Sequence, residues 1–347
     1  MMTGIVSQAA LAGWSELLPR RGVDVRKLCE DLRIDLTNTQ PDTGLIALSD
    51  FVAFLEQAGG HLKRPDFFWR AGEVYDLAML GPVGDAILAS KTLGGALKKF
   101  ATYFSLLQDS SEMTFVVDDQ HATISYRILD PTIWPRSSDA EFTLGIVAKL
   151  IRRVVGQSWR HTDVVFEVDT PFWGHAISDY LETNCAYGGA TNSIKIPVSW
   201  LSRPIQAPVP NSAVDSVLNS KLIEQRQQTT TKDRTRYHIF KTIGVSDVDQ
   251  TAIAKEMGMS RRTLRRRLER ESLNFQTLVD TCRMEVATLE LKRRPTASLA
   301  EVAFLLGYTE HSSFTRAFSR WSGLSPQNYR KSTLEFGDGA QFLCAAE

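Results

Sequence analysis

The chain has 347 residues, of which 43% are hydrophobic and 23% charged, with 22 glycines and 13 prolines. This length accommodates two domains, and the composition excludes collagen-like, low-complexity and wholly disordered chains. No stretch reaches the roughly 18 uninterrupted apolar residues of a membrane helix, and the N-terminus lacks the positive start of a signal peptide, so we expect a cytoplasmic protein without membrane contact. Disulfides, metal sites and cofactors are not expected, because the cysteines are far apart without ligand spacing: Cys29, Cys185, Cys282 and Cys344.

Charge is distributed unevenly along the chain, although 40 basic and 40 acidic residues cancel overall. Residues 232–331 hold 19 Lys plus Arg against 11 Asp plus Glu, a net of +8, which leaves the remainder at −8. A basic C-terminal part indicates a polyanionic partner for that part alone. A solvated surface is the alternative explanation, because charge by itself does not identify a partner.

The first 202 residues are predicted to form an α+β domain with a small antiparallel sheet packed on helices. Helical periodicity appears at residues 49–59, 82–90, 93–107 and 139–155. Strand-like alternation appears at residues 113–117, 121–129 and 163–168, with residues 118–120 forming a hairpin turn between the first two. The sequence shows no strand followed by a glycine-rich phosphate loop.

A linker is predicted for residues 203–231, because residues 203–210 contain three prolines and residues 225–233 contain no apolar residue. Apolar residues between these stretches recur at helical spacing and predict a short helix. We therefore expect an α+β domain at 1–202, an all-α domain at 232–331 and a tail at 332–347.

One pattern occurs twice in the all-α domain, 49 residues apart, at residues 253–260 and 302–309. Each copy reads apolar, Ala, two variable residues, apolar, Gly, apolar, hydroxyl. The small Ala permits a close helix crossing, the Gly can adopt the positive φ of a tight turn, and Ser260 or Thr309 can cap the next helix. Two copies in register predict a pair of helix-turn-helix motifs.

The helix after Ser260 carries six arginines and one acid in residues 261–270. A helical wheel places Leu264 and Leu268 on the buried side and opposes them with four arginines: Arg262, Arg265, Arg266 and Arg270. Arginine matches guanine O6 and N7 in the major groove and also binds phosphates. Ordinary surface ion pairs are the alternative, with Arg265 spaced for Glu269 and Arg267 for Glu271.

The second recognition helix is predicted to bury an aromatic stripe and expose short hydroxyl side chains with one arginine. His311 lies early in this helix, where base contacts are usual, and a phosphate contact or no contact is the alternative for this residue. A helix at residues 275–291 joins the two motifs and can hold them as a rigid pair.

Residues 232–331 resemble the DNA-binding domain of the AraC/XylS transcriptional regulators. The resemblance rests on Val302-Ala303, Gly307-Tyr308, Ser312-Ser313-Phe314, Phe318 and on Gly323-x-Ser325-Pro326-x-x-Tyr329-Arg330. It implies base contacts by Arg262, Arg265 and Arg266 in the first motif and by His311, Ser312, Ser313 and Arg316 in the second. Together with the wheel, the candidates for DNA contact are Arg261, Arg262, Thr263, Arg265, Arg266, Arg270, Thr309, His311, Ser312, Ser313 and Arg316.

The first 200 residues resemble, more loosely, the sensing domain of the branch of this family that contains ornithine and quorum-linked regulators. The resemblance implies that residues 1–202 form an effector-sensing and dimerisation domain, with an effector such as an amine, an amino acid or an apolar metabolite. Aromatic residues of an acidic domain suit a cationic or apolar guest, and the candidates are Trp69, Tyr103, Tyr126, Trp134 and Trp173. Core packing is the commoner role for each of them.

The chain is therefore expected to be a homodimeric transcription regulator that binds promoter DNA and responds to a small molecule. Activation through contact with RNA polymerase is what the resemblance implies, and repression is the alternative. One alternative is a regulator whose N-terminal domain only dimerises or contacts a protein. A DNA-targeted enzyme is the other, and the absence of an activated cysteine context or another catalytic motif argues against it.

Overall fold

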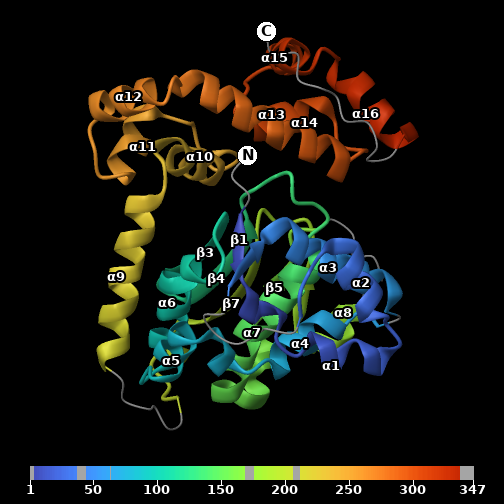
Figure 1. Ribbon diagram of the computed structural model, residues 1–347, viewed down its shortest axis with the longest axis vertical. Coiled ribbons are helices and arrows are strands. Elements are labelled where there is room, and N and C mark those ends of the chain that lie inside the picture. The colour runs from blue at the N-terminus through green and yellow to red at the C-terminus, as the bar shows by residue number, and fades with distance from the viewer. Residues whose placement is uncertain (1–3, 37–43, 63, 169–175, 206–211, 337–347) are drawn as a thin grey trace. The chain divides into compact units, whose positions relative to one another are not determined.

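The computed structural model describes residues 4–36, 44–62, 64–168, 176–205 and 212–336, which form two compact units (Figure 1). The first unit comprises Met1–Ile128 and Pro135–Gln227, and the second comprises Leu129–Trp134 and Gln228–Glu347. The predicted classes, α+β followed by all-α with two helix-turn-helix motifs, are confirmed.

Two sheets form in the first unit. A two-stranded antiparallel sheet pairs β1 (Ile5–Ser7) with β2 (Leu45–Ala47). A five-stranded sheet has the order β3-β4-β7-β5-β6. Its strands are β3 (Ser111–Val117), β4 (His121–Ile128), β7 (Asn192–Pro197), β5 (Asp163–Val165) and β6 (Asn184–Ala186).

The predicted hairpin is present between β3 and β4, which pair from Ser111 with Ile128 to Val117 with Ala122. The side chain of Asp118 closes its turn by accepting from the amides of Gln120 and His121, at 2.8 and 2.7 Å. The large sheet is mixed rather than purely antiparallel, since β5 and β6 run parallel. A parallel pair requires a crossover connection, which here contains helix α8 (Ala176–Leu181).

Helices of the first unit surround these sheets, and the longest, α7 (Ser137–Val155), is buried over most of its length. It packs closely on α4 (Phe67–Val74), where Gly72 and Gly145 meet. Because a Cβ at either glycine would overlap the backbone of the other helix, the two axes can approach closely only with glycine at both positions. The other α-helices before the predicted linker are α1 (Trp14–Leu17), α2 (Val25–Leu32), α3 (Leu48–His61), α5 (Pro82–Leu88) and α6 (Leu93–Tyr103).

The segment predicted as a linker contains α9 (Ser212–Gln228), which is longer than the short helix expected there. Polar contacts hold α9 to the end of α6 and the turn after it. Lys99 Nζ lies 2.8 Å from Asp215 Oδ2, and Gln225 Nε2 donates to the carbonyl oxygen of Ser105 at 2.7 Å. Most of α9 therefore belongs to the first unit.

Seven helices make up the second unit over the described residues, around a core of Ile, Leu, Val and Phe side chains. They are α10 (Thr231–Thr242), α11 (Gln250–Glu256), α12 (Arg261–Arg270), α13 (Phe275–Arg293), α14 (Leu299–Leu305), α15 (His311–Ser322) and α16 (Pro326–Phe336). The long helix α13 contacts α10, α14, α15 and α16, so it is the central helix of this unit.

Candidate DNA interface

The first helix-turn-helix is formed by α11 and α12. Gly258 between them adopts φ +71°, and Met259 N donates to the carbonyl oxygen of Ala254 at 2.9 Å to close the turn. Ser260 is the N-cap of α12, because its Oγ accepts from Thr263 N at 3.2 Å. The glycine, the cap and the buried Ala254 therefore have the roles that the repeated pattern predicts.

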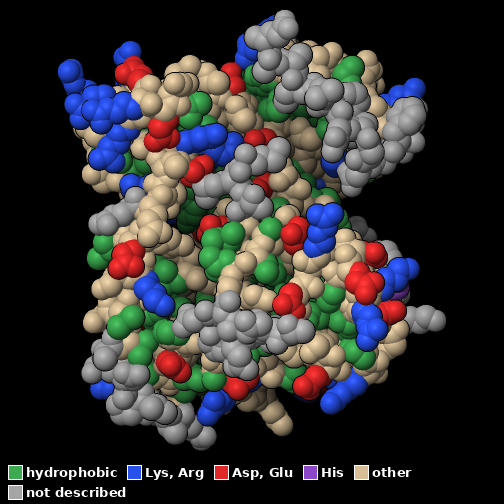
Figure 2. All heavy atoms as spheres, in the orientation of Figure 1, with side chains coloured by type: hydrophobic (Ala, Val, Ile, Leu, Met, Phe, Trp, Pro, Cys, Tyr) green, Lys and Arg blue, Asp and Glu red, His purple; other side chains and the backbone are tan. Residues whose placement is uncertain are grey.

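Helix α12 has one apolar side and one strongly basic side. Leu264 and Leu268 are completely buried, whereas the arginine side chains are exposed. The exposed arginines are Arg261, Arg262, Arg265, Arg266, Arg267 and Arg270. Figure 2 shows Lys and Arg side chains gathered over the position of α12, so this helix presents a concentrated positive surface to solvent.

The ion pairs considered from the sequence account for little of this charge. Arg265 Nε lies 2.8 Å from Glu269 Oε1, but its side chain remains 76% exposed and available to another partner. The carboxylate of Glu271 accepts instead from the backbone amides of Thr231 and Lys232, at 3.1 and 2.9 Å. It thus caps α10, and Arg267 is not its partner in these contacts. Arg267 is not among the four arginines that the helical wheel places opposite the leucines, but its side chain is exposed and adds to the same positive surface.

The second helix-turn-helix is formed by α14 and α15. Ser298 and Glu301 form the capping box of α14, with both reciprocal hydrogen bonds present. Gly307 adopts φ +81° in the turn. The prediction that Thr309 caps the next helix is wrong, because α15 begins at His311 with Glu310 at the N-cap and no side-chain cap bond.

Two faces are also present on α15, but its polar side carries fewer charges than that of α12. Phe314 and Phe318 are fully buried, and His311 and Arg316 are exposed. Arg316 Nη2 donates to Ser313 Oγ at 3.2 Å, which places these two predicted contacts side by side. Ser312 and Ser313 are half-buried, and Ser312 Oγ donates to the carboxylate of Glu310 at 3.1 Å.

Both recognition helices adjoin α13: α12 precedes it in the chain, and Arg320 Nη2 of α15 lies 3.3 Å from Asp280 Oδ2 of α13. With 19 residues, α13 is about 28 Å long at 1.5 Å per residue. Arg236 of α10 fixes its middle through Glu285, at 3.2 Å and 2.8 Å for the two guanidinium nitrogens. A bidentate pair of this kind, half-buried on both sides, makes α13 a stiff connection between the two motifs.

The five aromatic residues predicted to bind an effector do not share one environment. Trp69 is fully buried against Trp159 and Phe166, which is a core position. Tyr103 is also buried, and its hydroxyl donates to Asp215 Oδ1 of α9 at 3.2 Å.

The other three predicted residues are Tyr126, Trp134 and Trp173. Tyr126 is buried and hydrogen-bonded through its hydroxyl. Trp134 lies in the segment grouped with the second unit, where the guanidinium of Arg293 stands 5.7 Å from its ring centre. Trp173 falls outside the described residues.

Comparison with known families identifies the chain. A family described as "Arabinose-binding domain of AraC transcription regulator, N-term" matches residues 22–205, and a family described as "Helix-turn-helix domain" matches residues 253–332. The first match covers more than half of the chain. The protein is a transcriptional regulator with a helix-turn-helix DNA-binding domain, and it belongs to the AraC family.

Relatives of known name support the same assignment over nearly the whole length. The HTH-type transcriptional regulator VirS of Mycobacterium tuberculosis is 25% identical over 333 residues, covering 94% of this chain and 96% of VirS. The ornithine utilization regulator of Pseudomonas aeruginosa is 24% identical over 319 residues, covering 91% and 93% of the two chains. The HTH-type transcriptional activator FapR of Escherichia coli is 36% identical over 77 residues, covering 22% of this chain and 29% of FapR.

The matched families and relatives are regulators rather than enzymes, as the sequence analysis expected. Across the described residues, no helix has the length and apolar character required to cross a membrane.

Proposed function

We propose that this regulator inserts α12 and α15 into successive major grooves of promoter DNA. The observation that carries this proposal is the exposed arginine side of α12, opposite a leucine side that is completely buried. A recognition helix must have this division, because one side holds it to its unit while the other reaches base edges and phosphates. The proposed contacts are Arg261, Arg262, Thr263, Arg265, Arg266, Arg270, Thr309, His311, Ser312, Ser313 and Arg316.

We also propose that the first unit binds a small-molecule effector and forms a homodimer, so that ligand binding changes promoter occupancy. The match to an arabinose-binding-type domain and the similarity to an ornithine utilization regulator support a sensing role. The effector must bind one conformation of the regulator more tightly than another, because a ligand with equal affinity for both does not shift the equilibrium between them. We propose in addition that it activates transcription in the cytoplasm through contact with RNA polymerase. The similarity of one segment to a named transcriptional activator supports the activating role.

Substitution of Arg266 with alanine tests the DNA proposal. Arg266 lies in the middle of α12 and is exposed, and the ion pair within that helix is made by Arg265 and Glu269. Loss of one base-contacting arginine is expected to weaken specific binding by about 1 to 3 kcal/mol, or roughly 5- to 150-fold. The measurement is gel-shift titration on a duplex selected from a random library by the wild-type chain.

The matched control is Arg20→Ala, which removes the same charge from an exposed position of the first unit. It is expected to bind the selected duplex like the wild type. Equal affinity of the Arg266→Ala and wild-type chains for that duplex would contradict a role of this side of α12 in recognition.

A further inference from the structure

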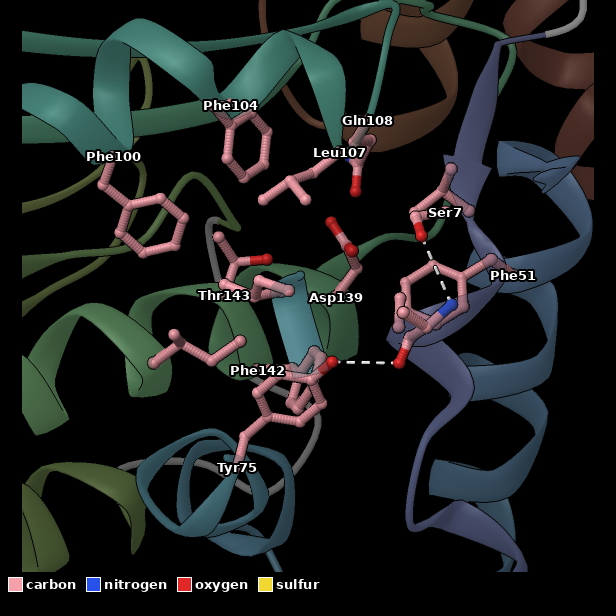
Figure 3. Close-up of a pocket in the computed structure, with 15 residues that line it drawn as sticks. Ser7, Phe51, Tyr75, Phe100, Phe104, Leu107, Gln108, Asp139, Phe142 and Thr143 are labelled. Carbon is pink, nitrogen blue, oxygen red and sulfur yellow. Dashed lines mark hydrogen bonds between the residues drawn. The ribbon is translucent and has the colours of Figure 1, made fainter. Parts of the chain in front are cut away.

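A cavity lies inside the first unit, and residues from several separate segments line it (Figure 3). Its walls are mainly apolar and aromatic, with Phe51, Phe100, Phe104 and Phe142 around it. The cavity volume is about 40 Å³, whereas one water needs only about 10 to 15 Å³ and a cavity that holds benzene has about 150 Å³. The space is therefore larger than a single water needs and suits only a very small organic molecule.

One acidic side chain, Asp139 near the start of α7, reaches this otherwise apolar space. Asp139 is only 1% exposed. Its Oδ2 accepts from the hydroxyl of Tyr126 at 2.5 Å, and Gln108 Nε2 donates to that hydroxyl at 2.6 Å and to Ser111 Oγ at 2.7 Å. Figure 3 shows the carboxyl group pointing into the space between Leu107 and Ser7.

The second carboxyl oxygen of Asp139, Oδ1, is buried and has no hydrogen-bond partner. A buried polar atom without a partner costs about 1 to 3 kcal/mol, and more if it is charged, so native proteins rarely leave one unpaired. The guanidinium of Arg136 attracts Asp139 but is committed to Glu167, with Nη2 at 2.5 Å from Oε1. Glu56 repels it. The described part of the chain thus supplies a polar anchor at the cavity whose remaining lone pairs are unused.

We propose that this cavity is the effector site and that it binds a primary monoamine with a short apolar body. The ammonium would donate to Asp139 Oδ1, and the short hydrocarbon body would lie against the phenylalanine walls. This assignment deepens the proposed sensing function and rests on it for its regulatory meaning. A carboxylate ligand is excluded by repulsion from Asp139 and Glu56, and a diamine would bury a second charge without a partner.

The protonation of Asp139 gives the binding a characteristic pH dependence. Burial raises the pKa of Asp139 to about 7, with repulsion from Glu56 acting in the same direction and the Tyr126 hydrogen bond and Arg136 acting against it. A simple alkylamine with a pKa near that of lysine, about 10.4, stays charged across this range. Below pH 7 Asp139 is mostly protonated, so the amine can bind only if Asp139 releases its proton. The affinity for the amine should therefore rise by up to tenfold per pH unit as the pH approaches 7, and should level off above it.

The test is calorimetric titration of the full chain with methylamine and with ethylamine, each compared with its matched alcohol and carboxylic acid. At pH 7.5 we expect saturable binding of at least one amine, at least tenfold tighter than its matched alcohol, and no binding of the acids. Asp139→Asn, which retains an acceptor for Tyr126, should weaken the amine at least tenfold and abolish the pH dependence. The charge-matched control Asp119→Asn, at an exposed turn position, should leave both unchanged.

A second variant keeps the test decisive if Asp139→Asn does not fold. Leu107 lines the cavity and is partly exposed, so Leu107→Trp should fill the space and abolish amine binding. The proposal is overturned if no amine binds the wild type, if the alcohol or acid binds better, or if amine binding survives both variants. Amine binding in the cavity without any change in promoter occupancy would instead refute the sensing function and leave the site assignment intact.

Discussion

Among single residues, Asp139 carries the clearest energetic signature, because a carboxyl group is buried here beside apolar walls. Its pKa of about 7 lies above the ordinary value of 3.8. Between these two values the folded chain holds a proton that the unfolded chain has lost. Stability contributed by this group is therefore present below about pH 4 and is lost as the pH rises to about 7.

Replacement of Asp139 by asparagine should remove this pH dependence, because an amide does not titrate. Relative to the wild type, the variant is expected to gain about 2 to 3 kcal/mol of unfolding free energy between pH 5 and pH 8, since one proton is worth up to about 1.4 kcal/mol per pH unit. Urea unfolding of the first unit at several pH values measures this difference.

The comparison with the wild type is needed because the pKa of Glu56 is raised as well. Burial raises the pKa of Glu56, and hydrogen bonds from Ser137 and Ser138 oppose that rise. Its contribution largely cancels between the two chains, and Asp119→Asn should follow the wild type. Parallel stability profiles for wild type and Asp139→Asn would show that the buried carboxyl does not hold a proton near neutral pH.

At the scale of elements, the crossing of α4 and α7 leaves no room for a side chain at either of its two glycines. A Cβ at Gly145 would lie 2.3 Å from the carbonyl oxygen of Trp69, and one at Gly72 would lie 2.2 Å from that of Phe142. Both obstacles are backbone atoms inside helices, so neither can move without displacing a whole element.

The substitution Gly145→Ala is therefore expected to destabilise the first unit by at least about 3 kcal/mol, beyond the usual range for overpacking. Gly60, near the end of α3, is the matched control, because a Cβ there meets nothing within 4 Å. Gly60→Ala should leave stability unchanged or raise it by up to about 1 kcal/mol. Equal melting temperatures for the two variants would mean that α4 and α7 do not cross at this distance.

Sequence patterns over a few residues predicted those helices and turns that are determined by neighbouring residues. Ser260, Gly258 and the spacing of Leu264 and Leu268 were enough to predict a turn, a cap and a two-sided helix. The hairpin at Asp118 was equally visible, because the side chain closes the turn within three residues. Signals between residues close in sequence were therefore enough to predict most helices of the second unit.

Features that depend on distant contacts were not predictable in the same way. Strand β7 pairs with both β4 and β5, and such non-local pairing leaves no short-range signal. The surroundings of Asp139 depend on Tyr126, which donates to its Oδ2, and on Gln108, which donates to the Tyr126 hydroxyl. Aromatic residues were proposed for the pocket from composition, yet Trp69 proved to be a core residue. A pocket is a property of packing, which one sequence does not reveal.

For the whole molecule, the separation of charge agrees with a division of labour between the two parts of the chain. Residues 232–331 carry +8 and the remainder −8, so only the C-terminal part attracts a polyanion. Within the second unit, α13 joins a highly basic recognition helix to a weakly charged one. The first helix should therefore provide more of the phosphate contacts and guanine readout, and the second should discriminate with fewer charges.

This asymmetry predicts that one chain protects two half-sites, about one duplex turn or 34 Å apart, that respond differently to substitution. The double variant Arg262→Ala with Arg265→Ala should lose protection of one half-site, together with a reduced salt dependence of binding. The double variant His311→Ala with Arg316→Ala should lose protection of the other, with a smaller change in salt dependence because it removes one permanent charge instead of two. Hydroxyl-radical footprinting on a selected duplex at two salt concentrations separates these effects. Loss of the same half-site in both variants would mean that the two helices do not read neighbouring grooves, and a unit held together by α13 would then engage DNA through one motif alone.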